Sequence, residues 1–487
     1  MNISNIFENG PDLEIDEIMT DSRKQGHNAI FFCIKGMVND GHDFVSQAVN
    51  NGAICVVHSR ELEEYQEGVT YLMVEDTMRA LNEFAAIFYG SPSEKMKVYG
   101  VTGTNGKSTI AWVTRYMVNN FVKCGYVGTI GVVIDRDVYD SPLTTPDTVY
   151  LHKMFREMYD QGCRAVSMEV SSIGLEEHRV DTIDFDVVSF TNLTHDHLDY
   201  HRNFDNYYKA KKKLFTMVGS DKTAVINIDD PYGELLRKES NARVVTYALE
   251  RAADYQAVDV QLFPDHTEFN ILYKGEKYPV YTNLVARFNV YNLLNVLAVL
   301  HEDGYTFEQL IPLCRTIPQV LGRMENIVEG QNFTMLIDYA HTPDGFEKVF
   351  EYARAITKPN HRIIVVFGSA GARDARKRSE LGRIADENCS VIILTSEDPR
   401  HEDPAQIAEA IRSGITRSAC LFIKDRYFAI RQGIELAQEG DTVMVLGKGD
   451  EDYMDIEGKK EHWMGDQNAA HEILREIMEE RGEENEA

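Results

Sequence analysis

A glycine-rich stretch early in the chain carries the residue types that bind phosphate. It stands between a predicted strand and a predicted helix, and it reads Gly100-Val-Thr-Gly103-Thr-Asn-Gly106-Lys107-Ser108-Thr109. Glycines let backbone N–H groups close around phosphates, and the helix N-terminus adds positive potential. Lys107 can reach the terminal phosphates and Ser108 can reach magnesium. The spacing departs from the standard GxxxxGK[ST] loop, because Asn105 or Val101 stands where that pattern needs a glycine.

A carboxylate and an imidazole follow two later predicted strands. Glu169 ends a predicted strand at 165–170, and His197 comes just after another at 187–191. In an open parallel sheet the C-terminal strand ends face the ligand crevice, so both side chains could share a divalent cation with the phosphates. A lone histidine at such a place is more often structural, and the phosphate loop is what favours the functional interpretation.

A lysine-rich helix is predicted over 207–215. Lysines occupy positions 209, 211, 212 and 213. One interpretation is a solvated basic face. Crowded like charges also lower a lysine pKa, so that one amine would be neutral and reactive near neutral pH. We therefore expect one of these lysines to be chemically modified.

The predicted elements that position these residues form three α/β units. Short apolar runs at 29–34, 53–58 and 70–74 indicate a small unit at 1–93, which ends in a linker-like segment. Strands and helices then alternate over 94–318 in the doubly wound pattern of a P-loop-type nucleotide-binding domain. A second alternation at 319–487 predicts a Rossmann-like domain, with these strands: 334–338, 362–367, 391–395, 420–424 and 442–446.

Composition limits the classes of function. The 487 residues include 50 Lys and Arg against 78 Asp and Glu, a formal net charge of −28, which argues against nucleic acid or an anionic membrane as a partner. Seven scattered cysteines without a CxxC pair suggest neither disulfides nor zinc. No signal peptide or membrane span is predicted. We expect a soluble, cytoplasmic monomer.

The motifs together resemble the Mur ligase family over nearly the whole chain. Thr20-Asp-Ser22-Arg23 is similar to the family's uridine-site motif, Gly103 to Ser108 to its ATP loop, and Thr144-Thr145-Pro-Asp147 to its muramoyl-peptide loop. Glu169, Asp196 and His197 also match the family pattern. The resemblance implies the following contacts to the UDP-sugar substrate: Thr20, Ser22, Thr144, Thr145, Ser171 and Arg179.

The same resemblance implies an ATP and magnesium site. Lys211 stands where the family carries a carbamylated lysine, a carboxylate-like ligand of the second magnesium ion. The implied catalytic residues are Lys107, Glu169, His197 and Lys211, and the implied metal ligands are Ser108, Glu169, His197 and carbamylated Lys211. The implied ATP contacts are Gly103, Thr104, Asn105, Gly106, Lys107, Ser108, Thr109, Asn292, Asp338 and His341.

The third domain is expected to select an amino acid. Family members that add meso-diaminopimelate read Asp-Asn-Pro-Arg where this chain has Glu397-Asp398-Pro399-Arg400. A guanidinium can hold the second carboxylate of diaminopimelate bidentately, and L-lysine has no such group. Asp398, however, adds a negative charge where an amide is usual, so L-lysine stays open as the alternative. The implied amino-acid contacts are Arg373, Glu397, Asp398, Pro399, Arg400, Gly447 and Glu451.

These expectations combine into one function. The resemblance implies an ATP-dependent amide ligase that activates the γ-carboxylate of UDP-N-acetylmuramoyl-L-alanyl-D-glutamate as an acyl phosphate and couples it to a diamino acid, as a step of peptidoglycan precursor synthesis. A folylpolyglutamate-type ligase is the nearest rival, and Asp21-Ser-Arg speaks against it. A non-catalytic paralogue that binds nucleotide is a rival of another class. A motor or transport ATPase finds no support in the sequence.

Overall fold

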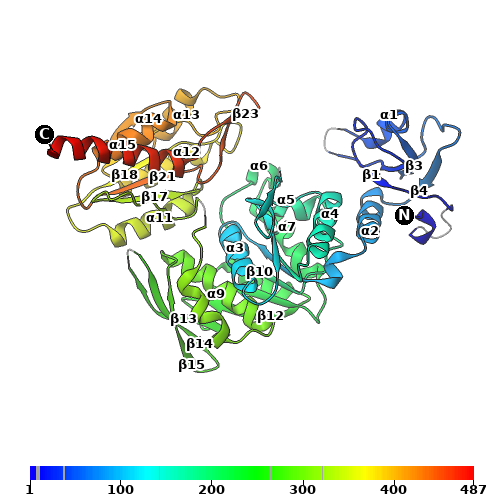
Figure 1. Ribbon diagram of the computed structural model, residues 1–487, viewed down its shortest axis with the longest axis horizontal. Helices are drawn as coiled ribbons and strands as arrows, with labels where there is room; N and C mark the ends of the chain where they lie inside the picture. Colours follow the sequence, from blue (N-terminus) through cyan, green and yellow to red (C-terminus); the bar gives the residue numbers. More distant parts are fainter. Residues whose placement is uncertain (7–10, 37–38, 142, 264, 321, 487) are drawn as a thin grey trace.

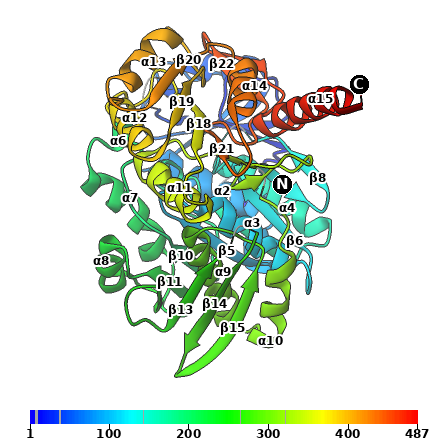
Figure 2. The same ribbon diagram turned by 90° about the vertical axis from the view of Figure 1, so that its left-hand side faces the viewer.

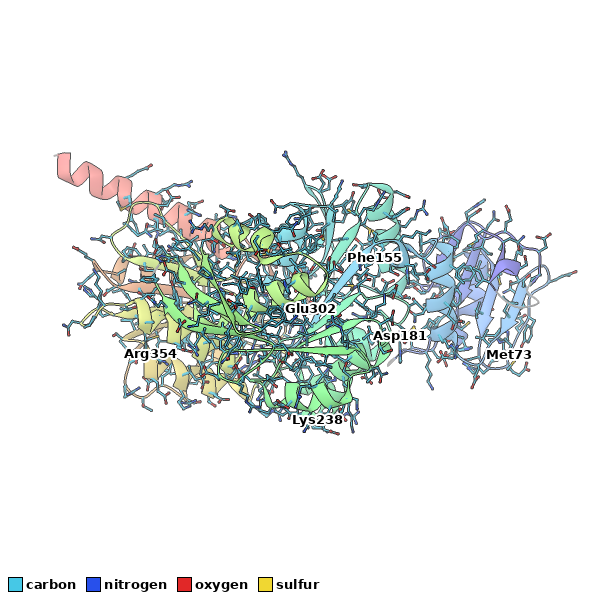
Figure 3. The ribbon with its side chains drawn as sticks, turned by 90° about the horizontal axis from the view of Figure 1, so that it is seen from below. Met73, Phe155, Asp181, Lys238, Glu302 and Arg354 are labelled. Atoms are coloured by element: carbon cyan, nitrogen blue, oxygen red, sulfur yellow. The ribbon has the colours of Figure 1, made fainter. Side chains whose placement is uncertain are left out.

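The computed structural model describes residues 1–6, 11–36, 39–141, 143–263, 265–320 and 322–486, and arranges them in three α/β domains. Figure 1 shows the N-terminal domain (blue) and the C-terminal domain (yellow to red) on different sides of the central domain (cyan to green). Seen from below, the N-terminal domain with Met73 lies at one end and Arg354 lies near the other (Figure 3). No helix of the described residues is both long and apolar enough to cross a membrane.

The N-terminal domain is a four-stranded parallel sheet in the order β1-β2-β3-β4. Strand β2 is buried along its whole length, which explains its continuous apolar sequence Ala-Ile-Phe-Phe. Helix α2 joins this domain to the central one, where its Asn82 carbonyl accepts a hydrogen bond from Thr182 Oγ1 at 3.3 Å. The elements are η1 (Ile3–Asn5), β1 (Glu17–Met19), β2 (Ala29–Phe32), η2 (Gly41–Phe44), α1 (Val45–Asn50), β3 (Ala53–His58), β4 (Thr70–Met73) and α2 (Thr77–Phe88).

The central domain is built on an eleven-stranded sheet in the order β15-β14-β13-β12-β11-β10-β5-β9-β6-β7-β8. Its strands are β5 (Lys97–Thr102), β6 (Cys124–Gly128), β7 (Gly131–Ile134), β8 (Asp137–Tyr139), β9 (Ala165–Glu169), β10 (Val187–Phe190), β11 (Thr223–Asn227), β12 (Arg243–Ala248), β13 (Tyr255–Leu262), β14 (Thr267–Tyr273) and β15 (Glu276–Thr282). Its helices are η3 (Pro92–Lys95), α3 (Lys107–Val118), α4 (Thr148–Asp160), α5 (Ser172–Glu176), α6 (Leu198–His201), α7 (Phe204–Met217), α8 (Pro231–Glu239), α9 (Arg287–Glu302), α10 (Phe307–Leu310) and η4 (Ile311–Thr316).

The expected strand–helix alternation is wrong for residues 255–282. Strands β13, β14 and β15 form an antiparallel meander with no helix between them, and Figure 2 shows them reaching away from the rest of the central domain. Lys274 and Gly275, both with positive φ, make the two-residue turn between β14 and β15. The six neighbouring strands β12, β11, β10, β5, β9 and β6 keep the parallel arrangement expected of a doubly wound domain.

The C-terminal domain carries a six-stranded sheet in the order β16-β17-β21-β18-β19-β20, parallel except for β16. All five strands predicted for this domain are present, within two residues of the expected bounds. Its strands are β16 (Glu325–Asn326), β17 (Thr334–Asp338), β18 (Ile363–Phe367), β19 (Val391–Leu394), β20 (Ala419–Phe422) and β21 (Thr442–Leu446), with a separate hairpin of β22 (Tyr453–Ile456) and β23 (Lys459–His462). Its helices are α11 (Pro343–Ile356), α12 (Lys377–Asn388), α13 (Pro404–Arg412), α14 (Arg426–Leu436) and α15 (Asp466–Glu486).

The parallel register places the chemistry at one sheet edge. Val101 of β5 pairs with Glu169 of β9, and Thr102 pairs with Phe190 of β10, so three strands end side by side. Contacts between the two domains hold the C-terminal domain over this edge, and two of them are short. Asn105 Nδ2 donates to Asp344 Oδ2 at 2.7 Å, and His195 Nε2 lies 3.0 Å from Asp374 Oδ2. The site is therefore assembled from two domains.

Candidate active site

The glycine loop wraps a small space at the start of α3. Gly100 lies inside β5, so the loop begins only at Gly103, later than the sequence pattern suggested. Gly103 and Gly106 have φ of 151° and 93°. An added Cβ would lie 1.8 Å from Thr191 Oγ1 at Gly103 and 2.4 Å from Asn292 Oδ1 at Gly106. Only glycine fits either position, and the backbone can then approach a bound anion closely.

Lys107 is held by the loop that it follows. Its Nζ donates to the carbonyl of Gly103 at 3.1 Å and to that of Thr104 at 2.8 Å. Burial lowers the pKa of Lys107, and the carboxylates of Glu169 and Asp196 oppose this shift. The next side chain, Ser108, is buried and lines the same cavity as Lys107. The cradle of backbone donors, lysine and helix N-terminus therefore fits a nucleotide polyphosphate.

Glu169 is fixed by neighbours on its own sheet. Its Oε1 accepts hydrogen bonds from Tyr126 Oη at 2.7 Å and from the Thr129 backbone N–H at 2.9 Å. The side chain is only 1% exposed. On the other side of the loop, Asp196 Oδ2 lies 3.4 Å from His197 Nε2. Burial would raise the pKa of Asp196, but nearby cations, first of all His197, lower it to about 2.

Lys211 differs from the other lysines of its helix. Its side chain is buried, and Nζ donates to the Gly103 carbonyl at 2.7 Å and lies 4.5 Å from the centre of the Tyr207 ring. Lys209, Lys212 and Lys213 instead form surface ion pairs with acidic residues. Burial and then the Lys107 charge lower the pKa of Lys211 well below its ordinary value. The expected cause, crowding among the helix lysines, is wrong.

The predicted magnesium ligands lie around one space. Ser108, Glu169, His197 and Lys211 all line a cavity of about 350 Å³. Among the described residues, no group of three or more His, Cys, Asp and Glu side chains could hold a metal ion. The donor set fits magnesium only if phosphate oxygens and a modified Lys211 complete it, because magnesium prefers oxygen ligands.

A second cavity of about 400 Å³ adjoins the glycine loop on its other side. Three of the predicted ATP contacts, Asn292, Asp338 and His341, line it. Both oxygens of Asp338 accept backbone N–H groups, from Met324 and Ala340, each at 2.7 Å. Burial lowers the pKa of His341 to about 4, so this imidazole is neutral at neutral pH.

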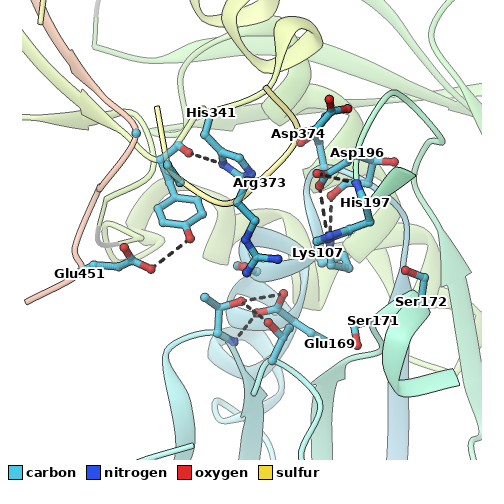
Figure 4. Close-up of a pocket in the computed structure, with 18 of the residues that line it drawn as sticks. Lys107, Glu169, Ser171, Ser172, Asp196, His197, His341, Arg373, Asp374 and Glu451 are labelled. Atoms are coloured by element: carbon cyan, nitrogen blue, oxygen red, sulfur yellow. Dashed lines mark hydrogen bonds and ion pairs between the residues drawn. The ribbon is translucent and has the colours of Figure 1, made fainter. Parts of the chain in front are cut away.

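The C-terminal domain supplies the far wall of the first cavity. Arg373 extends from this domain and lies between Glu451 and Lys107 (Figure 4). The other predicted amino-acid contacts that line this cavity are Glu397, Asp398, Arg400, Gly447 and Glu451. Pro399 instead faces a separate surface cavity. Residues predicted for the phosphate site and residues predicted for the amino-acid site thus face one another across a single cavity.

Arg400 is already engaged by the protein. Nε donates to Asp455 Oδ2 at 3.1 Å and Nη1 donates to the Gly371 carbonyl at 2.8 Å. Its backbone, with φ of 50°, is fixed by a hydrogen bond from its N–H to the Asp455 carbonyl. The guanidinium has a fixed place beside the cavity, and a bidentate grip on a ligand would use Nη2 and displace one protein contact.

The predicted UDP-sugar contacts fall into two groups. Thr145 Oγ1 donates to the Glu169 carbonyl at 3.0 Å and accepts the Ser171 N–H at 2.9 Å, while Arg179 Nη1 donates to the Thr145 carbonyl at 2.8 Å. Thr144 faces the first cavity beside them. Thr20 and Ser22 belong to the N-terminal domain and are not among the residues that line either cavity.

Several lining residues were not predicted. Lys448 lies between Gly447 and Glu451, which were both predicted to contact the amino acid. A charged residue in this glycine-rich segment could therefore have been included in the prediction. Arg323 lies 4.4 Å over the Tyr339 ring, with Nη2 3.5 Å from Ser108 Oγ. Its signal was a lone arginine within an apolar stretch, beside the presumed domain boundary. Lys377 faces the cavity from the start of α12, and nothing in the sequence pattern indicated it.

Glu397 gives a prediction about stability and pH. Burial raises its pKa to about 7, and Oε2 has no hydrogen-bond partner among the described residues. Between about pH 4.5 and pH 7, the Glu397 carboxyl group therefore keeps its proton in the folded state, whereas in the unfolded chain, where its pKa is near 4.5, it has lost it. Stability contributed by this proton is present below about pH 4.5 and is lost as the pH rises through 7.

We expect Glu397→Gln to remove this pH dependence. As the pH rises from mildly acidic to mildly alkaline, the free energy of unfolding of the variant should therefore increase by about 2 kcal/mol relative to that of wild type. Urea unfolding at both pH values measures it. Glu387→Gln is the matched control, because Glu387 forms a surface pair with Arg383. Parallel pH curves for wild type and Glu397→Gln would contradict the assignment.

Comparison with known proteins agrees with this architecture. Three family descriptions match the chain: Mur ligase middle domain (residues 101–300), Mur ligase, glutamate ligase domain (322–449), and Mur ligase family, catalytic domain (14–89). A UDP-N-acetylmuramoyl-L-alanyl-D-glutamate--2,6-diaminopimelate ligase of Clostridium botulinum (strain ATCC 19397 / Type A) is 36% identical over 469 residues, 95% of this chain and 96% of that protein. The enzyme of the same name from Geobacillus thermodenitrificans (strain NG80-2) is 38% identical and covers 92% of each chain.

The solved structures give the same answer for the fold. A structure of a UDP-N-acetylmuramoyl-L-alanyl-D-glutamate--2,6-diaminopimelate ligase, 28% identical, covers 98% of this chain and 99% of its own, with a TM-score of 0.70. The match extends over all three domains rather than over the nucleotide site alone. The chain is a member of the Mur ligase family.

Proposed function

We propose that this protein is an ATP-dependent ligase that adds meso-diaminopimelate to UDP-N-acetylmuramoyl-L-alanyl-D-glutamate, with magnesium as the metal. One observation carries the proposal: a single cavity of about 350 Å³ contains both the phosphate-binding residues of the central domain and the charged loops of the C-terminal domain. Such a cavity can bring an activated carboxylate and an amine together. The names of the relatives, which match over more than nine tenths of the chain, supply the substrates.

The reaction needs an activated carboxylate, because a carboxylate in water does not react with an amine at a useful rate. Transfer of the γ-phosphoryl group to the γ-carboxylate of D-glutamate gives an acyl phosphate. The amine then attacks through a tetrahedral intermediate, and phosphate leaves. Lys107 and the α3 N-terminus hold the phosphates in line for the first step, and closure of the C-terminal domain keeps water from the acyl phosphate.

Magnesium would be held by Ser108, Glu169, His197 and a carbamylated Lys211, and when bound it would neutralise phosphate charge. Carbamylation needs a neutral amine that attacks carbon dioxide, with loss of one proton. The lowered pKa of Lys211 supplies that amine. The carbamate N–H retains a donor for the Gly103 carbonyl, which Lys211 already contacts.

The acceptor end favours an amino acid with two carboxylates. Arg373 and Arg400 both face the cavity, and together they offer guanidinium donors that the side chain of L-lysine could not use. Because Arg400 is partly engaged, we propose that a carboxylate takes one contact from Arg400 and another from Arg373. L-lysine remains the alternative acceptor.

The proposal gives each domain one task. Residues 1–93 would bind the UDP-sugar, with Thr20 and Ser22 at the uridine, residues 94–318 would bind ATP and the peptide carboxylate, and residues 319–487 would bind the amino acid. A folylpolyglutamate-type ligase is disfavoured by the match of residues 14–89 to a Mur ligase description. A non-catalytic paralogue is disfavoured because Lys107, Glu169, His197 and Lys211 face one cavity.

Phosphate release tests the proposed reaction. The assay contains ATP, magnesium and UDP-N-acetylmuramoyl-L-alanyl-D-glutamate, with meso-diaminopimelate and L-lysine offered separately. We expect turnover that depends on diaminopimelate. Turnover with L-lysine alone would retain the mechanism and overturn the acceptor, and no turnover with either would overturn the proposed function.

Lys211 gives a sharper prediction. Lys211→Ala should lower kcat at least about 100-fold, since removal of a metal-supporting group costs roughly 10- to 100-fold and this group also contacts the loop. The matched control is Lys212→Ala on the same helix, where the lysine pairs with Glu239 at the surface. We expect this control to stay within about twofold of wild type, as a surface ion pair contributes little. Equal kcat values for the two variants would remove Lys211 from the mechanism.

A further inference from the structure

Lys448 is a buried cation that no motif assigned. It lies in the segment after β21, and its side chain is only 1% exposed. Nζ donates to Asp398 Oδ1 at 2.8 Å and to Glu451 Oε2 at 2.5 Å, and it lies 4.4 Å from the centre of the Tyr453 ring. A lysine in this environment has lost its water shell and depends on its two carboxylates.

The two carboxylates come from different loops of the acceptor wall. Asp398 follows β19, while Glu451 follows β21. Lys448 therefore ties the loop that carries Arg400 to the loop that carries Gly447. The remaining contacts fix each acid further: Asp398 Oδ1 accepts the Asp455 N–H at 3.0 Å, and Glu451 Oε1 accepts Tyr339 Oη at 3.1 Å.

The charges around Lys448 bear on which acceptor the cavity can bind. Glu397, Asp398 and Glu451 bring three carboxyl groups to one side of the cavity. Without a cation among them, these carboxyl groups would repel the carboxylate of a ligand and would favour a ligand with a net positive charge. Diaminopimelate carries two ammonium and two carboxylate groups with no net charge at neutral pH, whereas lysine carries a net positive charge.

We propose that Lys448 is a positioning and specificity-determining residue: it neutralises Asp398 and fixes Glu451, so that the acceptor cavity admits the second carboxylate of a diamino dicarboxylic acid. This inference rests on the proposed function and deepens it. Lys448 acts through the two carboxylates and not on the reacting atoms. Its effect belongs to acceptor binding and not to the phosphoryl-transfer step.

A charge-compensation series tests the inference. Lys448→Met removes the cation, Asp398→Asn removes the acid, and the double variant restores the wild-type charge balance. We expect Lys448→Met to raise the KM for diaminopimelate about tenfold with the KM for ATP unchanged, because an unpaired buried carboxylate then faces the ligand carboxylate. L-lysine should inhibit this variant more strongly than it inhibits wild type. Lys448→Arg keeps the charge but not the compact ammonium group, so its KM for diaminopimelate should lie between those of wild type and Lys448→Met.

The decisive measurement is the KM of the double variant for diaminopimelate. We expect Asp398→Asn with Lys448→Met to recover most of the loss seen in Lys448→Met, since the charge changes at Asp398 and Lys448 cancel while Glu451 still lacks its lysine partner. A double variant as impaired as Lys448→Met would show that Lys448 does not act by neutralising Asp398, and would overturn the inference. Urea unfolding identifies a variant that fails to fold. If Lys448→Met fails to fold, the double variant still tests the inference, because it removes Asp398 together with its partner Lys448.

The inference and the proposed function can fail separately. Wild-type protein that does not turn over diaminopimelate would contradict the proposed function. Wild-type turnover combined with an unchanged KM in Lys448→Met would contradict the inference alone.

Discussion

Buried charge is the constraint on which the rest of this structure depends. Lys107 and Lys211 lie close enough that both donate to the Gly103 carbonyl, and each loses hydration in doing so. Such a pair is tolerated only because the loop carbonyls and Asp196 face it, and because one amine can stay neutral. The same tension arises at the acceptor end, where Lys448 lies between two acids. A cavity that handles phosphate, carboxylate and ammonium groups must keep its own charges in near balance when empty.

That balance requires two domains. The central sheet edge supplies the glycine loop, Glu169 and His197, whereas the C-terminal domain supplies the guanidinium groups and the acceptor carboxylates. The contacts between the domains, from Asn105 to Asp344 and from His195 to Asp374, lie beside the glycine loop and close its edge. The closed arrangement therefore places the glycine loop and the charged loops of the C-terminal domain around one cavity. Separation of the domains would open the same space for substrates and products.

Much of this could be predicted from the sequence, for a physical reason. The buried parallel strands are continuous apolar runs, so Val391–Leu394 and Thr442–Leu446 were expected almost residue for residue. Glu169 and His197 were expected because functional side chains collect at strand ends. The β13 to β15 meander was missed because its half-buried strands follow one another through short turns, whereas a doubly wound pattern predicts a helix between strands.

Other features depend on packing that no local pattern encodes. The pKa of Lys211 is set by burial and by Lys107, which is distant in sequence. The roles of Lys448 and Arg323 depend on partners brought together by the fold. A pattern of residue types locates such a site, but it does not show which charges contact which.

The most direct test of the account is to follow one oxygen atom. The substrate UDP-N-acetylmuramoyl-L-alanyl-D-glutamate is prepared with a heavy oxygen isotope in its γ-carboxylate, and the phosphate released during ligation is analysed by mass spectrometry. An acyl phosphate between Lys107 and the acceptor loops requires that one carboxylate oxygen leave with the phosphate, so labelled phosphate is the predicted result. Unlabelled phosphate, formed at the same rate as product, would show that ATP cleavage does not activate the carboxylate and would contradict the account.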